Sequence, residues 1–227
     1  MKRTIFLSLI FLVLFTSVVF AHKPIFETRD TTFEKPIVVK DHTISYAIYG
    51  SLDKIDDVDF VKFEAKNKDP LFVQMTIPII KGNEDFSPSF AIIGKGIKQR
   101  DKLPFDIPEG YGSLVIKPSP KEYFYEKFTQ TKYYIRQTIR GEIPEDGEYY
   151  VAVFSDGEKG KYSLAIGEKE KFTVVDWLKM PFIYVVVKYF FNPFATVAVI
   201  GFIIILIFYI VKEEGPKLAL DYSASVL

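Results

Sequence analysis

The segment GEYYVAVFSDGEKGKYSLAI, residues 147–166, decides the fold of this chain. Two runs rich in β-branched and aromatic residues, 148–154 and 161–166, flank the stretch SDGEKG. β-Branched and aromatic residues favour strands, whereas Ser, Asp and Gly favour turns. The segment therefore predicts two strands joined as a β-hairpin.

The same pattern of short strands repeats upstream. Further strands are expected at 43–49, 58–65, 71–77, 89–93, 113–117 and 133–139, separated by Gly, Pro and Asp. No segment before residue 171 has a convincing helical period. Many short strands without helices predict an all-β domain with an antiparallel, jelly-roll-like β-sandwich, and an open barrel is the alternative.

Two apolar runs bracket this strand-rich region. Lys2 and Arg3 precede an apolar run that ends at Ala21, the pattern of a signal peptide over residues 1–21 that is cleaved after Ala21. An uncleaved signal anchor is the alternative. The second run, residues 193–211, contains no charged residue, and as a helix it would be about 28 Å long, close to the thickness of a hydrocarbon core. We expect a transmembrane helix there. The alternative is a buried core helix, but such helices are rarely apolar on every face.

The residues just before the second run combine aromatic side chains with lysines. Trp and Tyr favour the headgroup zone of a membrane, and lysine can extend its ammonium towards that zone. We expect Trp177, Tyr184, Lys188 and Tyr189 to lie at the membrane interface. The expected organisation is a signal peptide (1–21), an exported β-sandwich domain (22–171), a juxtamembrane segment (172–192), a transmembrane helix (193–211) and a cytoplasmic tail (212–227). The protein would then be a single-pass protein of the cell membrane with its domain outside the cytoplasm.

Composition excludes several kinds of function. Residues 22–176 contain 23 basic and 26 acidic residues, a net charge of −3, so there is no basic surface of the kind that binds nucleic acid. The chain has no cysteine, which excludes disulfides, thiol catalysis, cysteine-based zinc sites and iron–sulfur clusters.

Two long connections in the strand-rich region are candidates for binding. Loops at the ends of a sheet scaffold often carry binding residues. One connection, 95–112, contains Pro104 and Pro108. The other, 118–131, contains the candidate ligand platform Tyr123, Phe124, Tyr125 and Phe128. Alternatively, these aromatic side chains cover a sheet edge or extend the core.

The two histidines of the chain are candidate copper ligands. Cleavage after Ala21 would make His22 the first residue, whose amine and ring Nδ1 can chelate one metal ion. The imidazole of His42 would complete a nitrogen set suited to copper(II), which resembles the histidine brace of secreted copper proteins. The alternative is that both histidines are ordinary polar residues.

A cluster of carboxylates is a candidate calcium site. Asp53, Asp56, Asp57 and Asp59 lie close together in the sequence, and calcium prefers oxygen ligands. The spacing of an EF-hand loop and its closing Glu are absent, and Lys54 lies inside the cluster. The alternative is a solvated turn before a strand.

Part of the chain resembles a known family. The stretch DVDFVKFEA at 57–65, the following strand at 72–77 and the final strands at 147–153 and 160–166 resemble the bacterial pre-peptidase C-terminal (PPC-like) domains. The resemblance covers about residues 45–167 and implies a jelly-roll sandwich. It also implies an accessory binding or spacer module of the kind attached to secreted enzymes, but no catalytic partner domain is present in this sequence. The long middle connections depart from the family pattern.

No pattern of catalytic residues is recognisable. The sequence has no nucleophile elbow with a Ser-His-Asp set, no His-Glu-x-x-His and no Walker-type glycine loop. We therefore expect a non-enzymatic, membrane-tethered extracytoplasmic module that binds a protein or polymer partner. The alternatives are a copper-handling domain that uses His22, and an accessory subunit of a membrane complex.

Overall fold

The computed structural model describes residues 22–99 and 101–224, without the side chains of residues 210, 211 and 213–224. The predicted signal peptide therefore lies outside the described residues. The chain divides into two units, residues 1–177 and 178–227, and each is described by itself.

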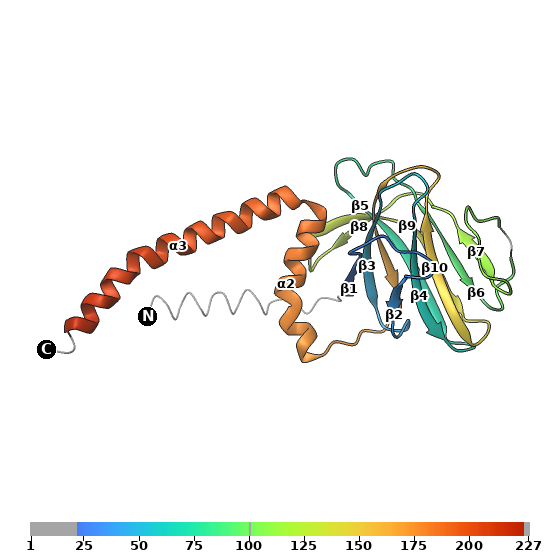
Figure 1. Cartoon of the computed structure of the whole chain (residues 1–227), viewed down its shortest axis with the longest axis horizontal. Coiled ribbons are helices and arrows are strands. Elements are labelled where there is room, and N and C mark those ends of the chain that lie inside the picture. Colours follow the sequence, from blue (N-terminus) through green and yellow to red (C-terminus); the bar gives the residue numbers. More distant parts are fainter. Residues whose placement is uncertain (1–21, 100, 225–227) are drawn as a thin grey trace. The chain divides into compact units, whose positions relative to one another are not determined.

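The first unit is a β-sandwich of two sheets (Figure 1). Its strands, in chain order, are β1 (Lys23–Phe26), β2 (Ile37–Val39), β3 (Tyr46–Leu52), β4 (Val58–Ala65), β5 (Pro70–Pro78), β6 (Ser89–Gly94), β7 (Gly112–Ile116), β8 (Glu122–Glu126), β9 (Thr131–Glu142), β10 (Gly147–Phe154) and β11 (Gly160–Ile166). Sheet A has the strand order β1-β3-β11-β5-β9-β8, and sheet B has the order β2-β4-β10-β6-β7. The prediction of a two-sheet β-sandwich is confirmed.

Strand direction differs from the prediction at two edges. β1 pairs with β3 and β2 pairs with β4 in parallel, whereas the other pairs are antiparallel. Each parallel edge strand comes from residues 22–42, which precede the first strand that the sequence analysis recognised.

The predicted hairpin between the last two strands is wrong. β10 lies between β4 and β6 in sheet B, whereas β11 lies between β3 and β5 in sheet A. The connection after Phe154 therefore crosses from one sheet to the other. Both strands are central in their sheets, which is why most of their residues are buried.

The core between the sheets consists of the inward residues of both sheets. Val61, Phe63, Val151 and Val153 come from sheet B, and Ile48 is among those from sheet A. A strand contributes alternate residues to one face, so each of these strands also has an outward face.

The outward face of sheet B is also apolar. Phe60, Ile93, Tyr150 and Phe154 form a second buried cluster there. Side chains from the connection 95–112 cover it, namely Leu103, Phe105, Ile107 and Tyr111. This connection is thus part of the core packing, with Leu103 buried and Phe105, Ile107 and Tyr111 partly buried.

Two helices follow the sandwich. They are α2 (Val174–Phe191) and α3 (Pro193–Ala224). In the part of the chain that the structure describes, no helix combines the length and apolarity that a membrane span requires. The predicted span 193–211 ends in two residues whose side chains are outside that part.

Candidate functional site

The most exposed aromatic cluster of the sandwich lies on β8. Among the described strands, β8 pairs only with β9 and forms the last position of sheet A. The side chains of Tyr123, Phe124 and Tyr125 remain 58%, 39% and 42% exposed. A row of exposed aromatic side chains on a sheet edge is unusual for a strand that has no partner to bind.

These residues were expected in a loop, and they form a strand instead. Tyr and Phe have high strand propensity, and β8 pairs in continuous register with β9. Tyr123 lies opposite Tyr134, and Phe124 lies opposite Tyr133. Cross-strand aromatic pairs of this kind stabilise a sheet.

Both ends of β8 are fixed by side-chain contacts. The ammonium of Lys121 lies 5.4 Å from the centre of the Tyr134 ring and donates to the carbonyl oxygen of Glu84 at 2.6 Å. At the other end, the Glu126 carboxylate accepts the backbone N–H groups of Phe128 at 2.7 Å and Thr129 at 2.6 Å. Phe128, the fourth residue of the predicted platform, is half-buried in this turn.

The two histidines have different surroundings. His22 is exposed, and its Nδ1, the atom required for a copper chelate, is hydrogen-bonded to the hydroxyl of Ser45. His42 is 3% exposed, and its ring stacks on Phe63 with the centroids 4.8 Å apart. Within the described residues, His42 Nε2 is buried without a hydrogen-bond partner. No contact between the two histidines is present among these interactions.

The four aspartates of the predicted calcium cluster separate into two environments. Asp57 accepts the backbone N–H of Asp53 at 2.7 Å, which closes the turn between β3 and β4. Asp53 and Asp56 are exposed in that turn. Asp59 is 1% exposed, because it occupies an inward position of β4 in line with Val61. Among the side chains that the structure describes, no three His, Asp or Glu groups are arranged to hold a metal ion.

Asp59 belongs to a buried polar cluster that the sequence analysis did not identify. Its carboxylate accepts the hydroxyl of Tyr162 at 2.8 Å and that of Thr31 at 3.2 Å. Glu27 lies within hydrogen-bonding reach of Asp59 and also accepts the backbone N–H of Ser51 at 3.0 Å. Desolvation, and then the adjacent Asp59, raises the pKa of Glu27 to about 9. Burial also raises the pKa of Asp59, so the two carboxyl groups hold a proton between them at neutral pH.

A signal for this cluster was present in the sequence. Asp59 alternates with Val61 and Phe63 in a strand whose inward face is otherwise apolar. An acidic residue at such a position needs a polar partner inside the fold. The partners Glu27 and Tyr162 lie 32 and 103 positions away, and no local pattern identifies them.

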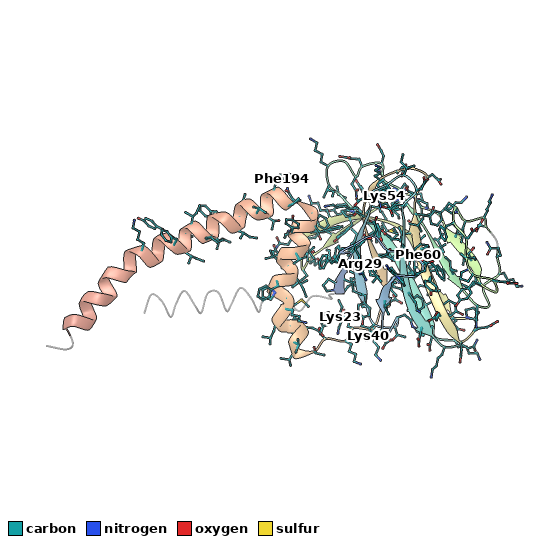
Figure 2. The ribbon with its side chains drawn as sticks, viewed as in Figure 1. Lys23, Arg29, Lys40, Lys54, Phe60 and Phe194 are labelled. Carbon is teal, nitrogen blue, oxygen red and sulfur yellow. The ribbon has the colours of Figure 1, made fainter. Side chains whose placement is uncertain are left out.

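An open pocket of about 580 Å³ lies at the opposite end of the sandwich from the turn between β3 and β4. Figure 2 shows Lys40, one of its lining residues, at one end of the strands and Lys54 at the other. Acidic side chains outnumber basic ones in its lining, which includes Asp41, Glu64 and Asp146. Several of these carboxylates already accept hydrogen bonds from neighbouring turns, as Asp146 does from the N–H of Asn67 at 2.7 Å.

The start of α2 is fixed to the sandwich within the first unit. Thr173 and Asp176 form a reciprocal N-terminal cap, with the Asp176 N–H donating to Thr173 Oγ1 at 3.2 Å. Lys23 of β1 forms an ion pair with Asp176 at 2.8 Å and lies 5.9 Å from the Phe172 ring centre. Lys23 and the cap hold the pKa of Asp176 at about 2.

The predicted interface residues lie on α2. Trp177 is 50% exposed and Tyr189 is 53% exposed. The ammonium of Lys188 lies 5.3 Å from the centre of the Tyr184 ring, one helical turn away. The membrane-interface position of these residues stays a prediction.

Comparisons with known proteins find similarity in solved structures alone. No protein-family model and no curated protein matches the chain. The lysozyme inhibitor PliG of Aeromonas hydrophila, a periplasmic inhibitor of g-type lysozyme, has 15% identity over 65% of this chain and 98% of its own, with a TM-score of 0.36. The pre-peptidase C-terminal domain of a collagenase from Bacillus anthracis has 13% identity over 61% and 97%, with a TM-score of 0.31.

A third similar structure is CorA of Methylomicrobium album BG8, a surface-associated copper-binding protein. It has 8% identity over 66% of this chain and 99% of its own, with a TM-score of 0.31. The PPC-like family that the sequence resembles is thus represented among the similar structures. At these TM-scores the similarities carry no argument about function.

Proposed function

We propose that this protein is a non-enzymatic, membrane-tethered module whose exported, jelly-roll-like β-sandwich binds a protein or polymer partner outside the cytoplasm. The observation that carries the proposal is the exposed aromatic edge, which we define as Tyr123, Phe124 and Tyr125 of β8. Aromatic side chains bury a large area on contact at a small cost in conformational entropy, and they are enriched in binding surfaces.

The location rests on the sequence. The basic start and apolar run of residues 1–21 support export, and the 19 uncharged residues at 193–211 support a tether. The aromatic and lysine side chains of α2 support an interfacial segment next to that tether.

The contacts at both ends of β8 support a binding role. Because Lys121 and Glu126 are held by neighbouring backbone groups, the strand between them is already ordered before a partner arrives. A pre-ordered surface loses less conformational freedom on association, which favours affinity.

Co-purification after mild solubilisation tests the proposal. We expect the full chain to recover the same companion in repeated trials, and the Tyr123→Ala, Phe124→Ala, Tyr125→Ala variant to lose it. The control is Ile55→Ala, since Ile55 is 61% exposed on the turn between β3 and β4, away from sheet A's β8 edge. Retention of the folded domain on an isolated envelope polymer, lost in the triple variant, would identify a polymer as the partner. Recovery of a monomer without companions, together with no polymer retention, would contradict the proposal.

A further inference from the structure

The aromatic edge lies within a palindromic sequence. Residues 121–127 read Lys-Glu-Tyr-Phe-Tyr-Glu-Lys, the same in both directions. The structure places the five central residues on the open edge of sheet A and the two lysines directly outside them. Any strand that pairs with β8 therefore meets the same order of charges whichever way it runs.

Three of the common protections against strand pairing are absent from the centre of this edge strand. Proteins commonly guard an edge strand with a proline, a β-bulge or a lysine at its centre. Glu122–Glu126 contains no proline or lysine, and its pairing with β9 shows no shift of register. The centre of the strand is three exposed aromatic residues instead.

The palindrome disfavours pairing between β8 and the β8 strand of a second copy of this chain. An antiparallel pair of two β8 strands in full overlap puts Glu122 opposite the other copy's Glu126, and Lys121 opposite the other copy's Lys127. Like charges directly opposite each other destabilise a strand pair.

The fixed side chains maintain this repulsion. Lys121 would lose its bond to the Glu84 carbonyl if it turned away, and Glu126 would lose its bonds to the turn at Thr129. A slip of two residues in either direction avoids the like charges, but it leaves only three of the five strand residues paired. The charge pattern thus disfavours full overlap with another β8 strand, and none of the described strands pairs with the outer edge of β8.

We propose that β8 takes up an extended segment of another protein, which adds to sheet A as a seventh strand. The segment carries an apolar triplet opposite the aromatic edge, a basic residue on each side opposite Glu122 and Glu126, and an acidic residue beyond each of these. This inference rests on the proposed function and specifies the partner's chemistry: backbone hydrogen bonds provide the strand pairing and the flanking charges select the sequence.

Two synthetic peptides test this inference. The first, Glu-Lys-Val-Tyr-Val-Lys-Glu, has charges complementary to the edge. The second, Lys-Glu-Val-Tyr-Val-Glu-Lys, has the same composition with the charges exchanged between positions. Both are capped at their termini and labelled, and fluorescence anisotropy measures their binding to the full chain in detergent.

We expect the complementary peptide to bind at least about tenfold more tightly than the exchanged one at low ionic strength, because four opposite-charge pairs replace four like-charge pairs. The ratio should fall as salt is added. The Tyr123→Lys, Tyr125→Lys variant should lose binding, whereas Ile55→Lys should retain it, with both variants melting at the wild-type temperature.

Equal affinity for the two peptides, no binding by either, or binding that survives in the Tyr123→Lys, Tyr125→Lys variant would overturn strand addition. If a companion or polymer is nevertheless lost on alanine substitution of the aromatic edge, the proposed function stands and only its mode is wrong. If the alanine variant of the aromatic edge retains that companion or polymer, the strand-addition inference and the proposed function are both contradicted.

Discussion

At the residue scale, the carboxyl pair of Glu27 and Asp59 makes the stability of the sandwich depend on pH. The folded state raises the pKa of Glu27 from 4.5 to about 9, so the folded state holds a proton that the unfolded chain releases. The free energy of unfolding should therefore decrease as pH rises from about 4.5 towards 9. Urea unfolding between pH 5 and pH 9 measures this slope.

Glu27→Gln is the matched variant for this prediction. It keeps the size of the side chain and its bond to Ser51 while removing the titrating group. The decrease in stability with pH should become shallower in the variant. A wild-type profile that is flat or that rises over this range would show that the pair is not protonated as described.

Gly50 leaves the space that the Tyr162 hydroxyl occupies beside this pair. A Cβ atom at position 50 would lie 2.4 Å from that hydroxyl and 3.0 Å from the Glu27 carboxylate. Tyr162 is fully buried and bonded to Asp59, so it has little freedom to move. We expect Gly50→Ala to lower the free energy of unfolding by about 1–3 kcal/mol. The control is Gly141→Ala, where a Cβ meets no atom within 4 Å and a change within about 0.5 kcal/mol is expected.

At the element scale, the connection 95–112 acts as a cover for the outward face of sheet B. Leu103 is 8% exposed and belongs to the same buried cluster as Phe60, Tyr150 and Phe154. Leu103→Ala should lower the free energy of unfolding by about 2 kcal/mol or more, because it removes buried methyl groups and leaves a cavity. Ile55→Ala, on an exposed turn, should change it by less than about 0.5 kcal/mol. Equal effects in urea unfolding would mean that this connection does not pack as described.

The elements also show how far the sequence alone determines the fold. Alternation and turn residues identified eight of the strands, because those signals are local. They did not identify which sheet each strand joins. β10 is apolar from Tyr149 to Phe154, and β11 is apolar at four of its seven positions. A connection of five residues permits either a hairpin or a crossing between sheets.

The candidate site was predicted in part. The aromatic residues of β8 were recognised as a candidate platform, but they were placed in a connection, 118–131, and not in a strand. Their exposure depends on β9 being the only one of the described strands that pairs with β8, which is a property of the sheet order. The partners of Asp59 also depend on which strands lie close together in space, so they were identified from the structure and not from the sequence.

At the scale of the whole molecule, the proposed membrane tether at residues 193–211 leads to a prediction about membrane extraction. If residues 193–211 span a membrane, the full chain should stay in the membrane pellet after alkaline carbonate extraction, since about 28 Å of uncharged helix matches the hydrocarbon core. A chain that ends at Lys171 should be exported and released in soluble form. Extraction of the full chain by carbonate would contradict the proposed tether.

Site-directed photo-crosslinking in the native membrane tests the central claim most directly. A benzophenone side chain is introduced in place of Phe124 on β8 and, separately, in place of Ile55 as the exposed control. The account predicts a discrete covalent adduct from position 124 and none from position 55. No adduct at position 124, or the same adducts at both positions, would contradict a binding role for the aromatic edge.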